Sequence, residues 1–280
     1  MDIRRSVTFI FKDPQWFRKM ILGTLMMLLG IFLFGFIVVL GYLMRILACS
    51  LDDVDTPLPE WKDFSGLLME GIYPCIIGAI YSIPSIFFVI IGAILVINGI
   101  PEAGFLILIV LLLTASAIST MLPVAFMRYI ITGNWKSAFS FSMLTDYVKK
   151  NKNTYFPALT AGSSMIMGLA FAGLLLPAII SVISLVLSGG ENQAFIIITY
   201  IFTGLAFIGG LAGAFIGQTM AYHFYGQAYR TGKPFPDDVD AAAVRGSIPP
   251  APFPVESNDA IPPPPAPSSE SKKNSSSTDS

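Results

Sequence analysis

Residues 153–190 of this chain, NTYFPALTAGSSMIMGLAFAGLLLPAIISVISLVLSGG, contain no Asp, Glu, Lys or Arg. A helix needs about 20 predominantly apolar residues to cross the hydrocarbon core of a bilayer. The stretch is longer than that and lacks the alternation of polar and apolar residues typical of a membrane β-strand. We therefore expect a membrane-spanning helix here, because the backbone in lipid must satisfy its own hydrogen bonds.

Three further stretches are equally free of charge, at 71–101, 103–127 and 192–229. The whole chain is 54% hydrophobic and only 12% charged, whereas an ordinary soluble domain is about 25% charged. This composition indicates an integral membrane protein and excludes a water-soluble enzyme. The predicted full spans, four in number, lie near 72–97, 104–127, 158–187 and 193–221.

The positive charges indicate the orientation of these spans. The 17 Lys and Arg residues gather in 1–19, 44–70, 128–152 and the stretch after 227. The short connectors 98–102 and 188–192 contain none of them. By the positive-inside rule, the basic stretches are cytoplasmic and the two connectors external. This predicts a multi-pass protein of the cell membrane with both termini in the cytoplasm.

The first apolar segment, residues 20–43, conflicts with this scheme if it is one straight span. A single crossing would place the five basic residues of 1–19 outside. We therefore favour a bent or re-entrant hairpin that breaks around 30–36, between Gly30 and Gly35, with a single span of exceptional orientation as the alternative. The predicted fold is an all-α, polytopic transmembrane helical bundle with four full spans plus this hairpin, or five to six membrane segments.

Three regions follow from the composition. Residues 1–19 mix basic and bulky apolar groups, as in an interfacial amphipathic segment whose cations face anionic lipid. Residues 20–232 form the transmembrane helical domain, and 233–280 form a Pro/Ser-rich cytoplasmic tail that is expected to be disordered. Residues 135–150 also have an amphipathic pattern, which suits either a membrane-surface helix or a helix packed on the cytoplasmic face of the bundle.

The most distinctive polar stretch lies between the first two apolar blocks. A candidate interaction loop consists of Arg45, Pro59, Glu60, Trp61 and Asp63, with several more acids nearby. In a functional interpretation it binds a protein partner at the cytoplasmic face. In a structural one Trp61 anchors the loop, and Arg45 pairs with Glu60 or Asp63.

Small residues mark one face of the last span. Gly209, Gly213 and Gly217 recur at intervals of four, which allows close helix packing. Their partner is either another helix of the same chain or a second copy in a homo-oligomer.

Groups for chemistry are scarce. There is one histidine, His223, and there are two cysteines, so we assign no catalytic, cofactor-binding or metal-binding residue and expect no enzyme. The net charge of −1 gives no support for nucleic-acid binding. We expect membrane lipids as partners and a non-enzymatic scaffold or interaction protein. The alternative is a transporter or pore for a neutral or lipid-like small substrate.

Several motifs together resemble a known family. They are Asp13-Pro14 with Trp16, Gly41-Tyr42 with Arg45, and Leu58-Pro59-Glu60-Trp61 with Asp63. Over roughly residues 5–232 the chain resembles a prokaryotic membrane family known as domain of unknown function 4013. The resemblance implies a multi-helix membrane protein of prokaryotes, and it supplies no catalytic residues because the family has no assigned activity.

Overall fold

A computed structural model describes residues 3–52, 58–188, 193–232 and 234–235. All the regular structure in these residues is helical, which confirms the predicted all-α fold. The α-helices are α1 (Ile3–Thr8), α2 (Trp16–Leu28), α3 (Phe34–Leu51), α4 (Phe64–Ile97), α5 (Pro101–Thr132), α6 (Phe141–Lys150), α7 (Lys152–Ser188) and α8 (Gln193–Thr231). Short 3-10 helices are η1 (Ile10–Lys12), η2 (Leu29–Phe32) and η3 (Trp135–Phe139).

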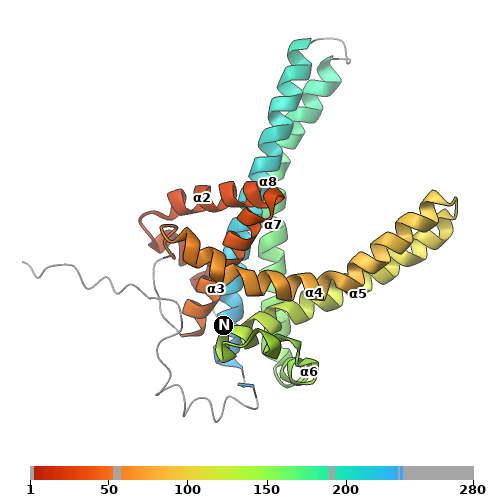
Figure 1. Ribbon diagram of the computed structural model, residues 1–280. Helices are drawn as coiled ribbons and strands as arrows, with labels where there is room; N and C mark the ends of the chain where they lie inside the picture. The colour runs from red at the N-terminus through yellow and green to blue at the C-terminus, as the bar shows by residue number, and fades with distance from the viewer. Residues whose placement is uncertain (1–2, 53–57, 189–192, 233, 236–280) are drawn as a thin grey trace, which may run out of the picture.

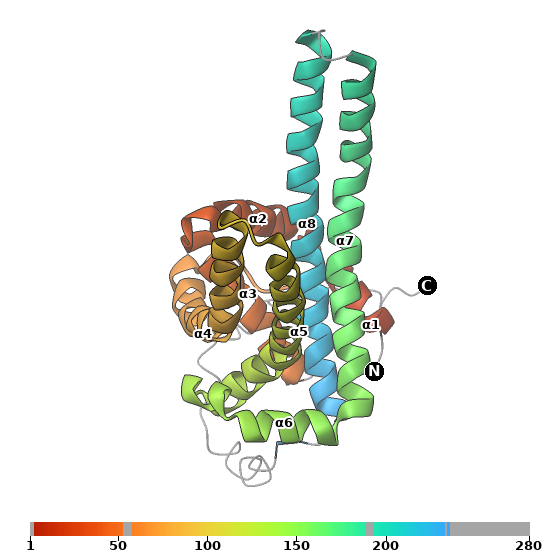
Figure 2. The same ribbon diagram turned by 90° about the vertical axis from the view of Figure 1, so that its right-hand side faces the viewer.

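Two long antiparallel helix pairs dominate the shape. Helices α4 and α5 form one pair and α7 and α8 the other, and the two pairs diverge from a common base (Figures 1 and 2). The remaining helices gather around this base, with α3 between the pairs and α6 across the foot of α7 (Figure 2).

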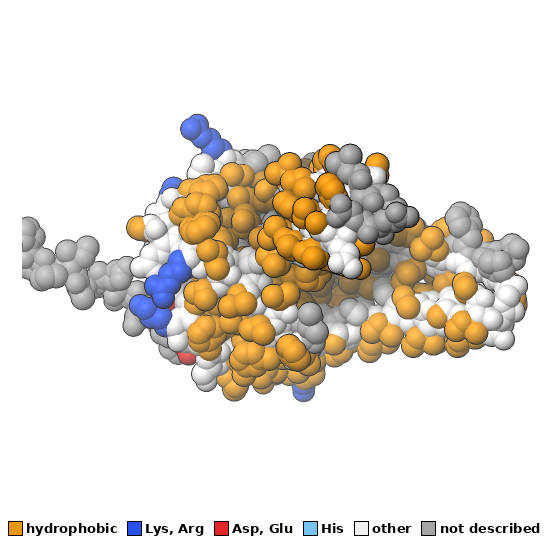
Figure 3. Space-filling model, turned by 90° about the horizontal axis from the view of Figure 1, so that it is seen from above, with side chains coloured by type: hydrophobic (Ala, Val, Ile, Leu, Met, Phe, Trp, Pro, Cys, Tyr) orange, Lys and Arg blue, Asp and Glu red, His pale blue; other side chains and the backbone are white. Residues whose placement is uncertain are grey.

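Burial divides each pair into an inner and an outer part. We call residues 82–97 with 106–121, and 163–186 with 193–212, the outer arms. Among their described side chains only Ser181, Ser184 and Ala206 are buried, while apolar groups such as Ile97 and Val186 are 83% and 73% exposed. Hydrophobic side chains cover most of the face seen from above, and basic ones lie at its margin (Figure 3). The base, in contrast, holds two large buried apolar clusters.

The helices are longer than the predicted spans. Five of them have the length and composition to cross a membrane, namely α3, α4, α5, α7 and α8. The predicted spans lie inside these helices, but α4 has 34 residues and α8 has 39, which correspond to about 51 and 59 Å. The outer arms alone measure about 24–36 Å, close to the thickness of a hydrocarbon core of about 30 Å. The remaining length of each helix builds the base.

The predicted break in residues 20–43 is confirmed. Helix α2 ends at Leu28, η2 follows, and α3 begins at Phe34. Leu33, between them, has a φ of 61°, in the left-handed region where residues with a Cβ are rare. Gly35 allows the tight return, because a Cβ there would overlap the carbonyl oxygen of Met26. A single straight helix is therefore excluded for this segment.

The N-terminal segment packs on the base more than its pattern indicates. Phe9 and Ile10 are buried in a core cluster, whereas Phe11 and Phe17 are exposed. Contact of 1–19 with a membrane surface stays a prediction. The predicted disordered tail, 233–280, falls outside the described residues except for 234–235, of which Phe235 is buried against Tyr147.

Helix α6 also packs on the base. Its apolar side chains Leu144 and Tyr147 are buried in the base, and Lys149 and Lys150 face away from it. Of the two interpretations of residues 135–150, packing against the bundle describes these side chains.

Candidate functional site

Trp61 anchors the segment that precedes α4. Its side chain is 4% exposed and stacks on Tyr42 of α3, with ring centroids 4.2 Å apart and an interplanar angle of 8°. The ring centroid of Phe215 of α8 lies 6.1 Å from that of Trp61. Trp61 therefore joins α3, α8 and the entry to α4 through apolar contact, and its ring is not available to a partner.

Asp63 caps the N-terminus of α4. Its Oδ1 accepts a hydrogen bond of 2.8 Å from the backbone N–H of Gly66, which satisfies one of the free donors at the helix start. Its Oδ2 lies 3.1 Å from Nη2 of Arg45. The Gly66 N–H and then the Arg45 guanidinium lower the pKa of the Asp63 carboxyl below its usual value.

Arg45 has its main partner on α4. Its Nε donates to Oε2 of Glu70 over 2.6 Å and its Nη2 donates to Oε1 over 2.8 Å, the two-pronged geometry that gives arginine–carboxylate pairs their strength. The expected pairing of Arg45 with Asp63 is present, but Glu60 lies elsewhere. Glu70 cannot be recognised from spacing, because the packing of α3 on α4 creates the contact.

Glycines bring α3 and α4 close enough for this pair. A Cβ on Gly41 would overlap the carbonyl oxygen of Leu67, and a Cβ on Gly71 would overlap the carbonyl oxygen of Ile37. The two backbones are therefore in direct contact, which holds the guanidinium and the carboxylates at hydrogen-bonding distance.

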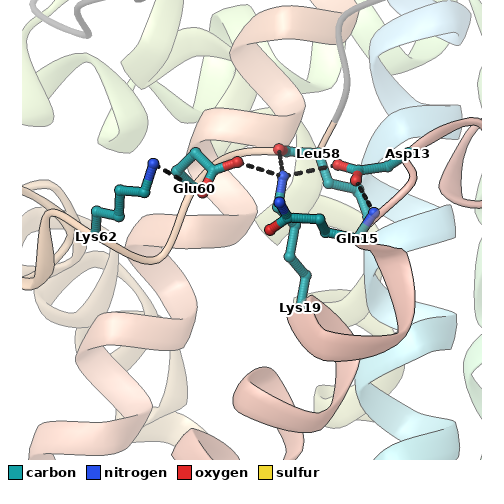
Figure 4. A network of polar contacts seen from close by, with 6 residues as sticks. All are labelled: Asp13, Gln15, Lys19, Leu58, Glu60 and Lys62. Atoms are coloured by element: carbon teal, nitrogen blue, oxygen red, sulfur yellow. Dashed lines mark hydrogen bonds and ion pairs between the residues drawn. The ribbon is translucent and has the colours of Figure 1, made fainter.

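Glu60 belongs to a second polar centre, built around Lys19 (Figure 4). The Lys19 ammonium donates to Oδ2 of Asp13 over 2.7 Å and to the carbonyl of Leu58 over 2.6 Å, and it lies 2.9 Å from Oε1 of Glu60. Oδ1 of Asp13 accepts the backbone N–H of Gln15 at 2.7 Å.

This centre is buried. The side chains of Lys19 and Asp13 are 5% and 2% exposed. Sequence reasoning placed Lys19 among the cations that face lipid, and that placement is wrong for this residue. The only sequence signal is the Asp13-Pro14 turn directly before α2, since the other two partners of Lys19, Leu58 and Glu60, come from a loop about 40 positions later.

Gly209, Gly213 and Gly217 of α8 lie against α7 of the same chain. A Cβ on Gly209 would overlap the carbonyl oxygen of Gly173, and one on Gly213 would overlap that of Leu169. A Cβ on Gly217 would press on the backbone of Ile166. Farther out, the hydroxyl groups of Ser181 and Ser184 donate to backbone carbonyls of α8, as polar groups do between membrane helices.

His223 lies in a further polar cluster in the base. Its Nδ1 is 3.1 Å from Oγ of Ser6, and Gln227 donates its Nε2–H to the same hydroxyl over 3.0 Å. Phe9 stacks on the imidazole with a centroid distance of 4.1 Å. These contacts dock α1 on α8 and make His223 a packed histidine.

Metal-binding geometry is lacking in the described ranges, where no three His, Cys, Asp or Glu side chains gather to hold an ion. Cys49 and Cys75, which both lie in these ranges, are free thiols.

The fold and these centres define a class: a helical protein with several helices long and apolar enough to cross a membrane. Residues 24–164 match the family described as "Protein of unknown function (DUF4013)", and the chain belongs to that family. The match is shorter than the 5–232 expected from the motifs. It includes Arg45, Trp61 and Glu70 but leaves out Lys19 and all of α8. No curated protein and no solved structure matches the chain.

Proposed function

We propose that this chain is a multi-pass cell-membrane protein that acts as a non-enzymatic scaffold. The observation that carries the proposal is the division of each helix pair into an apolar, exposed outer arm and a buried base. Apolar groups such as Ile97 and Val186 are costly in water, whereas in lipid their exposure is favourable. The outer arms cross the bilayer, and the base stands at one surface.

The base lies on the cytoplasmic side, with both termini. Every described Lys and Arg belongs to the base, and the connectors 98–102 and 188–192 contain neither residue in the sequence. This distribution follows the positive-inside rule.

Cysteine labelling tests the orientation. In a chain with Cys49 and Cys75 changed to Ser, we place one new cysteine by Asn98→Cys at the tip and another by Ser142→Cys on α6, two exposed positions. A membrane-impermeant maleimide should label the tip in intact cells and α6 only after permeabilisation. The reverse pattern would overturn the orientation, and equal labelling of both positions in intact cells would contradict insertion of the arms between them.

The scaffold role is supported by the way the strongest polar groups engage one another. The ion pairs of Lys19 with Asp13 and of Arg45 with Glu70 hold the elements of the base together. The surface left for a partner on the candidate loop is formed by Lys62, Asp63 and Glu60, which are 84%, 54% and 44% exposed.

Partner capture tests that surface. Cross-linking in native membranes followed by affinity purification should recover one stoichiometric partner protein. Lys62→Glu should lower its yield, while Lys149→Glu, a charge reversal at an exposed lysine on α6, should not. Equal yields with both variants would contradict the loop as the contact surface.

The alternative, a transporter or pore for a neutral or lipid-like small substrate, is favoured by an apolar groove between α2 and α8. Flux of such a substrate in liposomes containing the purified chain, without any stoichiometric partner, would support transport over the scaffold.

A further inference from the structure

Helices α2 and α8 enclose a half-open groove of 510 Å³ at the root of the second outer arm. Phe17, Ile21 and Leu25 line it from α2, and Ile208, Ala212 and Ile216 line it from α8. The hydroxyl of Thr24, which also borders it, already donates to the carbonyl of Met20 over 2.9 Å. The groove therefore offers mainly apolar contact.

Helices α2 and α8 are in direct contact next to the groove. Gly23 of α2 packs directly on the Phe215 ring, which occupies the space that a Cβ would need. Phe215 is fully buried and contacts Tyr42 and Trp61. The groove thus lies between two helices that are both packed on the core. Figure 1 shows α2 meeting α8 where the outer arm of α8 begins.

The rim carries a positive charge. Arg18 is exposed and precedes Ile21 by three positions and Leu25 by seven, so the three share one edge of α2. Within the part of the chain that the structure describes, no ion pair of Arg18 is found. A cation therefore borders the apolar wall at the level where the outer arm enters the base.

We propose that this groove binds one acyl chain of an anionic phospholipid, with the lipid phosphate at Arg18. The inference rests on the membrane placement proposed above, and it is independent of the scaffold role. The wall of the groove continues into the exposed apolar surface of α8 at Leu205 and Ile208, which faces acyl chains once the arm is in the bilayer.

The size of the groove distinguishes a lipid from a second copy of the chain. Its volume falls in the range of small-molecule sites, about 300–1,000 Å³. A helix with side chains is about 10–12 Å across, and a helix from a neighbouring copy would need a longer and wider seat. A flexible chain of methylene groups fits the space, and the guanidinium suits a phosphate bidentately.

The test uses the full chain in phosphatidylcholine vesicles that contain phosphatidylglycerol with a photoactivatable diazirine at the end of one acyl chain. After irradiation, labelled peptides are mapped by mass spectrometry. We expect labelling of 16–28 and 205–216 in excess of labelling of the outer arm 83–97, which serves as the internal measure of insertion.

Two variants and a matched control sharpen the test. Ala212→Phe fills the groove and should lower its labelling to the level of the outer arm, whereas Ala93→Phe, an exposed position on α4, should leave it unchanged. Arg18→Gln should lower the preference for phosphatidylglycerol over a phosphatidylcholine probe by about fivefold, the usual effect of one cation near anionic lipid. Thermal unfolding of each variant shows whether it folds.

The outcomes separate this inference from the proposed function. Labelling of the arm without excess in the groove, or excess that survives Ala212→Phe in a folded protein, overturns the lipid site while insertion stands. An equal preference for both headgroups in wild type and Arg18→Gln overturns the role of Arg18. Absence of label from the arm itself overturns membrane insertion. Cross-links between two copies at the groove would assign it to a dimer and overturn the proposal.

Discussion

Replacement of Lys19 by Met should destabilise the base more than any other change of a single charge in the described part of the chain. The ammonium lies 2.7 Å from Asp13 and both side chains are buried. Two unit charges at that distance attract with about 6 kcal/mol at an effective dielectric constant of 20. Burial of both charges offsets much of this attraction, so the pair itself is not the source of the full loss.

The larger effect comes from the group that is left behind. In Lys19→Met the Asp13 carboxylate keeps the Gln15 N–H as its one remaining donor among the described residues, and the Leu58 carbonyl loses the Lys19 ammonium. Breaking a buried pair in this way costs about 3–5 kcal/mol. Asp13→Asn is milder, about 1–3 kcal/mol, because Lys19 keeps Glu60 and the Leu58 carbonyl.

The assay is thermal unfolding of the detergent-solubilised chain, followed with a dye that reacts with newly exposed Cys49 and Cys75, which are half-buried in the folded chain. At about 2–4 °C per kcal/mol, Lys19→Met should lower the Tm by about 6–20 °C. Lys62→Met is the matched control, because Lys62 is 84% exposed and 3.8 Å from Glu60, and it should change stability by less than about 1 kcal/mol.

The double variant tests the cause. Asp13→Asn combined with Lys19→Met should be more stable than Lys19→Met alone, because it removes the buried carboxylate that has lost its cation. The reasoning is refuted if Lys19→Met and Lys62→Met unfold at the same temperature, or if Asp13→Asn costs more than Lys19→Met.

Three further outcomes are expected. Gly41→Ala should lower the free energy of unfolding by about 1–3 kcal/mol, because the added methyl group overlaps a backbone carbonyl of α4. Gly78→Ala, where the added Cβ meets open space, should be neutral or stabilising. Equal effects of the two variants in thermal unfolding would contradict the close contact at Gly41. The pKa of Asp63 is lowered in the folded chain, so the stability that its carboxylate contributes is present above the pKa of the unfolded chain, about 3.9, and is lost as the pH falls through the lower pKa of the folded state. Asp63→Asn should remove this part of the acid dependence when unfolding is measured from pH 5 to pH 2. An unchanged profile would count against this role of Asp63. Ser6→Ala should cost about 1–3 kcal/mol and speed amide exchange of α1, since the hydroxyl joins α1 to α8; unaltered exchange would show that the apolar contacts alone dock the helix.

The loop before α4 shows how far spacing can predict a site. The sequence offers Glu60 or Asp63 as the partner of Arg45, and the structure pairs Arg45 with Asp63. An Asp directly before an apolar helix also suits an N-cap whatever packs around it. The structural interpretation expected Trp61 to anchor the loop, and it does so from within the core. Its burial depends on Tyr42 and Phe215, residues of two other helices, and periodicity along one segment contains no information about them.

The helical class, the long apolar segments, the short connectors without Lys or Arg and a break around 30–36 were all decided by the amino-acid sequence alone. Hydropathy and charge act locally along the chain, and a backbone in an apolar solvent has few ways to satisfy its hydrogen bonds. Only the tertiary structure decided how much of each helix is bare and how much builds the base, and only it turned Lys19 from a surface cation into the centre of a buried network. That network forms because a turn before α2 and a loop about 40 residues later meet at one point, and the desolvation of a charge depends on all its neighbours at once.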